Sequence, residues 1–154
     1  DQNLQNILSE KKVISTISAD DYESLFFPGG HGPLWDLTND ADSIQMIEHF
    51  WSIKKPVAAV CHAPAVFLNV KDAAGEPLVK GKNVTGFTNS EEAAVQLTDV
   101  VPFLLEDELK KKGGMYTKKE DWASHIVKDG LLLTGQNPAS SIAAAKELVK
   151  MLKK

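Results

Sequence analysis

The chain has 154 residues, of which 43% are hydrophobic and 25% are charged, and its formal net charge is −4. This length and composition suit one globular domain over residues 1–154 with a sizeable core. All 17 basic residues are lysine. Arginine is the preferred reader of phosphates and base edges, so the composition argues against a nucleic-acid partner. A single cysteine excludes an internal disulfide and favours a cytoplasmic location, and no apolar run approaches the roughly 20 residues of a membrane span.

Strands and helices alternate along the first half of the chain. An amphipathic helix is predicted over Thr38–Lys54, because Ile44, Ile47, Phe50 and Trp51 recur at helical spacing. Three short apolar runs read as strands: Val13–Ser18, Ser24–Phe27 and Val57–Val60. Cys61 then begins a further helix, directly after the third strand.

The second half continues the alternation. Val79–Phe87 reads as a strand or hairpin, and the pair Asp129-Gly130 predicts a hairpin between Ser124–Val127 and Leu131–Thr134. Helices are predicted over Ser90–Leu97 with Ser90 as N-cap, over Val100–Lys112, and over Pro138–Lys154. The last helix has one apolar stripe, formed by Ile142, Ala145, Leu148, Val149 and Leu152. Strands alternating with helices predict an α/β fold with a mostly parallel sheet covered on both faces.

Cys61 stands at a corner between a strand and a helix. A sharp strand-to-helix turn exposes its corner side chain and needs small neighbours, a demand that Ala59 and Ala63 meet. The amide groups of the following helix point at the sulfur, so we expect the thiol to ionise more readily than a free one. A lone cysteine is more often a small buried apolar residue. The adjacent His62 and the spacing of the corner favour a nucleophile here.

Three loops follow predicted strands directly: Pro28–Gly32, Cys61-His62 and Gly135–Pro138. In such sheets the site lies beyond the carboxyl ends of the strands, so these loops are expected to meet. Paired glycines let the backbone approach a ligand closely. Amides of His62 and of Gly29 or Gly30 are therefore candidates for an oxyanion hole.

A nucleophilic thiolate needs a proton acceptor and a group that orients the acceptor. His62 is the candidate base, although neighbours at a corner need not touch. His31, Asn89, Glu91 and Glu92 are the candidates to orient an imidazole. Asn89 is equally well explained as a turn residue, and the two glutamates as acids of a first helical turn. No metal site is predicted, because no second cysteine or histidine pair has ligand spacing.

At these residues the chain resembles the ThiJ/PfpI superfamily, which has the class I glutamine-amidotransferase-like fold. Three segments carry the resemblance: Phe26–Pro33, Ala58–Ala65 and Leu133–Ser141. Two more, Val84–Asn89 and Leu97–Leu109, are similar to the branch of heat-shock chaperones with glyoxalase III activity.

The resemblance implies a flavodoxin-like three-layer sandwich, a homodimer and a site that converts methylglyoxal to lactate without glutathione or another cofactor. Cys61 is then the nucleophile, His62 its partner, and Gly29 and Gly30 the oxyanion side. His31, Asn89 and Asn137 join these as candidates for substrate binding. Two features depart from the pattern. Relatives begin with a strand, helix and strand that carry a glutamate near the cysteine, so the chain resembles their carboxyl-terminal two thirds. Two interpretations stay open: the domain is truncated, or a separate N-terminal segment on another chain completes the fold. Some relatives have Asp where this chain has Asn89.

Other functions share these residues. A holdase chaperone would suppress aggregation without Cys61, and a redox sensor would oxidise that thiol to sulfenic acid. A cysteine peptidase or amidase would use the same nucleophile on another substrate.

Overall fold

The computed structural model describes residues 2–153, and its centre is a four-stranded sheet with the order β1-β2-β6-β5. Strands β1, β2 and β6 are parallel, whereas β5 runs antiparallel to β6 across the predicted Asp129-Gly130 hairpin. The mostly parallel α/β sheet expected from the sequence is therefore present. The strand bounds are Leu25–Phe27 for β1, Val57–Val60 for β2, Ile126–Asp129 for β5 and Leu132–Gly135 for β6.

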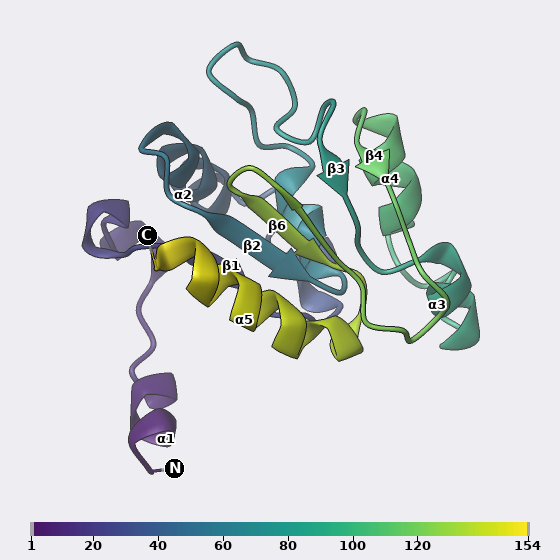
Figure 1. Cartoon of the computed structure of the whole chain (residues 1–154), viewed down its shortest axis with the longest axis horizontal. Coiled ribbons are helices and arrows are strands. Elements are labelled where there is room, and N and C mark those ends of the chain that lie inside the picture. Colours follow the sequence, from purple (N-terminus) through teal and green to yellow (C-terminus); the bar gives the residue numbers. More distant parts are fainter. Residues whose placement is uncertain (1, 154) are drawn as a thin grey trace.

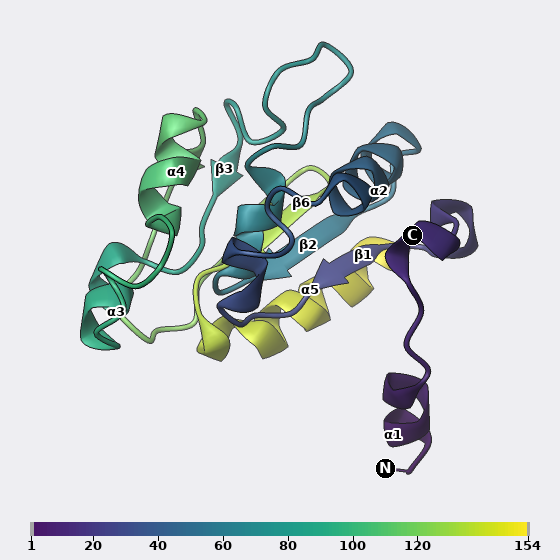
Figure 2. The ribbon, with the colours of Figure 1, turned by 180° about the vertical axis from the view of Figure 1, so that it is seen from behind.

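Helices cover both faces of the sheet (Figures 1 and 2). On one face α5 (Ser141–Leu152) packs against Ala58, Val60 and Leu133. On the other face α2 (Ala41–Ser52) and the short 3-10 helix Ala63–Phe67 belong to the larger core cluster, which also contains Val57 and Ala59. All four residues of β2 are buried. Alternate side chains of a strand point to opposite faces, so this central strand is apolar throughout because it contributes to both cores.

A smaller unit lies beside β5, where the Asn83 amide donates to the Asp129 carboxylate. It contains β3 (Asn83–Val84), α3 (Asn89–Ala94), α4 (Leu105–Lys111) and β4 (Met115–Tyr116). β3 and β4 form a separate parallel pair, so the strand expected over Val79–Phe87 is only two residues long. In Figure 1 this unit places α3 beyond the ends of β2 and β6.

The N-terminal region differs from the prediction. The run Val13–Ser18, expected as a strand, contains a 3-10 helix over Ile14–Thr16. The Thr16 hydroxyl donates a hydrogen bond to the Val13 carbonyl at 2.7 Å, and such local bonds compete with strand pairing. Before it, α1 (Gln2–Ser9) stands apart from the rest of the chain (Figures 1 and 2). A second 3-10 helix, Ala19–Asp21, leads towards β1.

Three predicted helices have different limits or faces. Thr88, and not Ser90, is the N-cap of α3, where it forms a capping box with Glu91. α4 begins at Leu105 and not at Val100, because Pro102 disfavours helical geometry in the residue before it. In α5 the buried face consists of Ala144 and Leu148, whereas Ile142 is 70% exposed. The predicted stripe on the last helix was therefore wrong except at Leu148.

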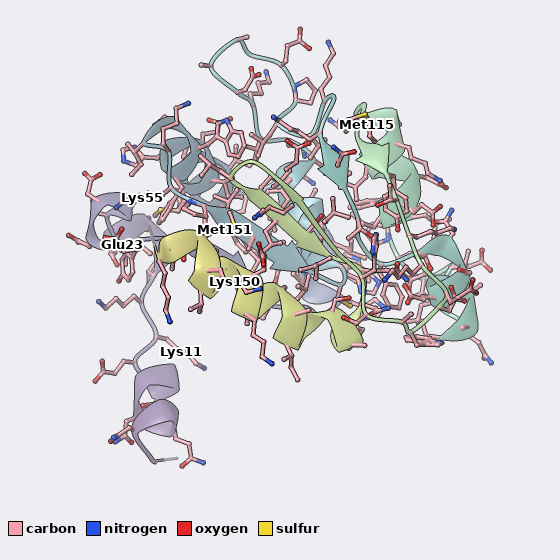
Figure 3. The ribbon with its side chains drawn as sticks, viewed as in Figure 1. Lys11, Glu23, Lys55, Met115, Lys150 and Met151 are labelled. Atoms are coloured by element: carbon pink, nitrogen blue, oxygen red, sulfur yellow. The ribbon has the colours of Figure 1, made fainter. Side chains whose placement is uncertain are left out.

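The two ends of the sheet differ in character. Glu23, Lys55, Lys150 and Met151 gather where the strands begin (Figure 3), and Lys55 donates hydrogen bonds there to backbone carbonyls, including that of Tyr22 at 2.6 Å. Cys61 lies at the opposite end, where β2 stops. Within residues 2–153 no helix has the length and hydropathy that crossing a bilayer requires.

Candidate functional site

Cys61 occupies a strained corner between β2 and the 3-10 helix Ala63–Phe67. Its φ of 63° lies in the left-handed region, which residues other than glycine rarely adopt and which often marks functional positions. The corner is fixed on both sides, because the Cys61 amide donates to the Gly135 carbonyl and the Cys61 carbonyl accepts from the Phe87 amide, each at 2.9 Å. The turn predicted at Cys61 is present, but the helix after it is a short 3-10 helix that starts at Ala63.

The side chains of Cys61 and His62 converge. The Cys61 Sγ lies 3.4 Å from the His62 Nδ1, and the His62 Nε2 lies 2.6 Å from the Glu92 Oε2. All three residues are buried, with Cys61 6% exposed and Glu92 2%. The ring of Phe87 packs on the His62 imidazole at a centroid distance of 4.1 Å. Thiol, imidazole and carboxylate thus form one line, the order of groups that activates a nucleophile by general base catalysis.

Glu92 accepts from a second imidazole. The His31 Nε2 lies 3.1 Å from the Glu92 Oε1, so each carboxylate oxygen faces a different histidine. The rings of His31 and His62 are 3.8 Å apart at their centroids and tilted by 35°. Of the candidates proposed to orient an imidazole, Glu92 lies within hydrogen-bond distance of the His62 ring nitrogen, and His31 packs on the His62 ring and contacts Glu92.

The resting site disfavours charge. Burial raises the pKa of the Cys61 thiol above its ordinary value, and the negative charges of Glu91 and Glu92 act in the same direction, against hydrogen bonds from the Gly30 and His62 amides. Burial also lowers the pKa of His62, although its hydrogen bond to Glu92 opposes this. The expectation of an easily ionised thiol was therefore wrong, because the helix-end amides are outweighed by the loss of water around the sulfur. The pair rests as a neutral thiol beside a neutral imidazole.

The glycine loop after β1 approaches the cysteine closely. A Cβ on Gly29 would lie 2.8 Å from the Cys61 Cβ, so no other residue fits there without a shift. Gly30 has a φ of 123°, which only glycine adopts readily. Hydrogen bonds from the amides of Gly30 and His62 reach the sulfur. These are amides expected on the oxyanion side, and the structure brings both to the reacting atom.

Asn89 and Asn137 do not join this cluster. The Asn89 side chain donates to Asp107 at 2.8 Å, and its backbone amide donates to Glu106, so it faces α4 and not His62. The Asn137 side chain donates to Glu91 at 2.7 Å and to the Ala123 carbonyl. The Oδ1 atom of Asn89 has no hydrogen-bond partner among the described residues. The substrate-binding roles expected of Asn89 and Asn137 stay predictions.

Glu91 is the residue whose role local sequence could not reveal. Its carboxylate is fully buried and accepts from backbone and side-chain groups of three segments: the Thr88 amide at 3.0 Å, the Trp122 amide at 2.8 Å, the Gln136 side chain at 3.1 Å and the Asn137 side chain at 2.7 Å. The loop Gly135–Pro138 thus holds the first turn of α3 in place through Glu91. The pairing of two adjacent acids in a first turn was the available signal, but it fits an ordinary helix start equally well.

His31, His62 and Glu92 also form a set of donors that metal ions accept, with ligand atoms within 4.8 Å of one another. Two imidazoles and one carboxylate are a common donor set for transition metals. The three come from distant parts of the sequence, so the spacing argument against a metal could not detect them. The predicted absence of a metal stays a prediction.

Comparison with known proteins places these residues in a family. The sequence profile of the DJ-1/PfpI family matches residues 6–151. Glyoxalase 3 of Candida albicans is 34% identical over 148 residues, which cover 92% of this chain and 63% of that protein. The glutathione-independent glyoxalase HSP31 of Saccharomyces cerevisiae is 33% identical, over 99% of this chain and 67% of that protein.

Solved structures agree in fold. The Rapid Encystment Protein 24 KDa of Francisella tularensis, 38% identical, matches with a TM-score of 0.93 over 99% of this chain and 68% of that one. Glyoxalase III from Candida albicans, 34% identical, matches with a TM-score of 0.84 over 89% of this chain and 60% of that one. The present chain spans about two thirds of the length of these relatives. With the match over residues 6–151 and the shared flavodoxin-like architecture, the chain belongs to the DJ-1/PfpI family.

Proposed function

We propose that this chain carries the catalytic thiol of a glutathione-independent glyoxalase that converts methylglyoxal to lactate. The observation that carries the proposal is the buried line from the Cys61 Sγ through His62 to Glu92. The two relatives described above, named glyoxalase 3 and glutathione-independent glyoxalase, support it. A small reactive aldehyde is the proposed substrate.

The chemistry begins from the neutral pair. His62 takes the thiol proton at Nδ1 as the sulfur adds to the aldehyde carbon, and Glu92 stabilises the imidazolium that results. The aldehyde oxygen becomes the anion of a hemithioacetal, and we expect the amides of Gly30 and His62, which act on the sulfur beside it, to stabilise that anion. The His62 imidazolium returns its proton to this oxygen, and the neutral imidazole then moves a proton from the former aldehyde carbon to the neighbouring carbon through an enediol, giving a lactoyl thioester. Water releases lactate and restores the Cys61 thiol.

Neutral resting groups suit this route. A thiol that ionises only as substrate arrives is protected from other electrophiles, and it reacts slowly with peroxide, because the thiolate is the reactive form. The redox-sensor alternative is therefore the weaker one. A peptidase or amidase would use the same thiol, and the choice of substrate separates it from a glyoxalase.

Replacement of the sulfur tests the proposal. The natural protein should form lactate from methylglyoxal without glutathione, and Cys61→Ser should remove that activity while the circular dichroism spectrum and melting temperature stay close to those of the wild type. Lactate formation by Cys61→Ser at the wild-type rate would refute it. Turnover of a peptide or amide substrate, with none of methylglyoxal, would favour the hydrolase alternative.

The remaining expectations stay predictions. They are a homodimer, a holdase activity independent of Cys61, a cytoplasmic location, and a separate N-terminal segment whose glutamate assists Cys61. Terminal analysis and the intact mass of the natural protein test the last of these. Suppression of client aggregation by Cys61→Ser tests the holdase activity.

A further inference from the structure

The backbone of Trp122 is strained. Among residues 2–153, four residues other than glycine have a positive φ: Lys54, Cys61, Gln96 and Trp122. Lys54 and Gln96 directly follow the C-caps of α2 and α3, a position where the chain commonly adopts the left-handed conformation. Cys61 is the proposed nucleophile. The φ of 64° at Trp122 has no such helix end to explain it.

The strain lies in a turn where glycine would be the ordinary residue. The Ala123 amide donates to the Glu120 carbonyl at 3.0 Å, so Trp122 is the third residue of a four-residue turn. Glycine or asparagine usually supplies a positive φ at this position. A bulky residue there costs free energy. Such strain is concentrated at functional sites, and it persists only where the surrounding contacts enforce the conformation.

Neighbouring segments hold this turn in place. The segment between β4 and β5 passes beside α3 (Figure 1), and the Trp122 amide donates to the buried Glu91 carboxylate at 2.8 Å. The Asn137 side chain donates to the carbonyl of the next residue, Ala123, also at 2.8 Å. The backbone of Trp122 is therefore fixed by α3 and by the loop after β6, and this fixes the place from which its ring extends.

The Trp122 ring packs against the side chain that covers His62. Its centroid lies 5.8 Å from that of Phe87, edge to face, and the Phe87 ring lies 4.1 Å from the His62 imidazole. The Phe87 amide donates to the Cys61 carbonyl, so the backbone that carries this ring is attached to the Cys61 corner. Phe87 is 4% exposed, whereas Trp122 is 47% exposed. Trp122 therefore adds less to the core than a buried tryptophan would, but it contacts Phe87.

The imidazole of His62 must face two partners at once. Its Nδ1 lies 3.4 Å from the Cys61 Sγ, and its Nε2 lies 2.6 Å from the Glu92 Oε2. These two contacts leave the ring free to tilt about the line through both nitrogens, and the packed ring of Phe87 restricts that tilt. Proton transfer between sulfur and nitrogen depends on this alignment, so the position of Phe87 affects the rate of the reaction.

We propose that Trp122 is a positioning residue of the glyoxalase site, whose ring holds Phe87 against the His62 imidazole. The strained turn is the means by which the chain places that ring. This inference rests on the proposed function for its kinetic consequence. The contacts among the three rings do not depend on the substrate.

Glycine at position 122 separates positioning from structural support. Trp122→Gly removes the ring and relieves the strain, so its melting temperature should stay within a few degrees of the wild type. Its kcat for methylglyoxal should fall about 10- to 100-fold with KM unchanged, the loss expected when a reacting group is misplaced. Trp122→Phe keeps an aromatic ring beside Phe87 and should recover most of the kcat. Lys54→Gly is the matched control, because it relieves the same kind of strain where the strands begin, and its kcat should equal that of the wild type.

Four results would overturn the proposal. They are a wild-type kcat in Trp122→Gly, a loss of kcat that Trp122→Phe does not repair, and a rise in KM with kcat unchanged, which would assign the ring to the substrate instead. The fourth is a melting temperature of Trp122→Gly far below that of the wild type, which would make Trp122 a structural residue.

A second measurement does not depend on glyoxalase activity. An aromatic ring packed on an imidazole shifts the proton NMR signals of that imidazole, so the carbon-bound protons of His62 should resonate away from ordinary histidine positions in the wild type and in Trp122→Phe. At the same pH they should move towards the ordinary positions in Trp122→Gly, and His62→Gln identifies the signals by their absence. Unchanged His62 signals in Trp122→Gly would overturn the positioning role. A wild type that forms no lactate but shows this difference would refute the proposed function and leave the positioning role standing.

Discussion

Glu91 and Glu92 are adjacent in the first turn of α3, and both are buried, but their carboxylates contact different kinds of groups. Glu91 faces neutral donors: the amides of Thr88 and Trp122 and the side chains of Gln136 and Asn137. Glu92 faces two imidazoles, His31 and His62. A carboxylate that accepts hydrogen bonds from amide groups, which do not titrate, holds segments of the chain together. A carboxylate held by imidazoles belongs to proton chemistry, and this difference separates support from function within one helical turn.

The largest effect should follow from Glu92→Gln. Without a negative charge beside its Nε2, His62 loses the stabilisation of its imidazolium, so we expect lactate formation to fall by about 100- to 10,000-fold. The fold should survive, because the amide still fits the space and bonds the histidines. Steady-state kinetics with a parallel thermal melt measure both. A variant with wild-type kcat would show that Glu92 only supports the site.

Glu91→Gln should give the opposite pattern. Its new NH2 group would face donors that now lack an acceptor, which costs about 1–3 kcal/mol in the free energy of unfolding. Turnover per folded molecule should stay within a few-fold of the wild type below the melting temperature. Chemical denaturation and kinetics on the same preparation provide the comparison. A stable but inactive Glu91→Gln would contradict the division of roles.

The pH dependence of Cys61 alkylation sharpens the comparison, since both acids act on the thiol. The pKa of Cys61 is raised by burial and by the charges of Glu91 and Glu92, so the wild-type rate of iodoacetamide reaction should rise with a midpoint above that of a free thiol. Removal of the Glu91 charge should move the midpoint to lower pH. A wild-type midpoint below that of free cysteine would contradict this expectation and would support the easily ionised thiol that the sequence predicted.

The smallest effect concerns the cap that positions both acids. The Thr88 hydroxyl accepts from the Glu91 amide at 3.0 Å. Thr88→Ala should therefore lower the free energy of unfolding by about 1 kcal/mol. Ser90→Ala is the matched control, because Ser90 bonds Asp121 and does not cap the helix, and it should change stability less. Urea titrations of the two variants compare their free energies of unfolding. A larger loss of stability in Ser90→Ala than in Thr88→Ala would contradict the assignment of Thr88 as the N-cap.

Much of the architecture was predictable because short stretches of the sequence determine it. The apolar run Val57–Val60, the small residues around Cys61 and the Asp129-Gly130 turn each specify a conformation over a few residues. The strand ends then predicted that the glycine loop and the Cys61-His62 pair would meet. The strand expected at Val13–Ser18 failed because it has no partner strand, a matter of tertiary context.

The site was predictable in its nucleophile and not in its acid. Glu92 contacts a histidine 30 residues earlier in the chain, and the contact depends on how α3 packs against the end of β2. The sequence alone therefore did not distinguish Glu92 from Glu91 and Asn89 as the group that orients the His62 imidazole. The ionisation of Cys61 was misjudged for a related reason. Amides at a helix start are visible in a sequence, whereas the removal of water from a sulfur is set by the whole fold.

The most direct test follows the sulfur itself during turnover. The wild type and the Glu91→Gln and Glu92→Gln variants are mixed rapidly with methylglyoxal, quenched in acid and analysed by mass spectrometry. A lactoyl thioester on Cys61 should form and decay with lactate release in the wild type and in Glu91→Gln, and should form far more slowly in Glu92→Gln. Lactate that accumulates while Cys61 stays unmodified in a time-resolved series would contradict the account.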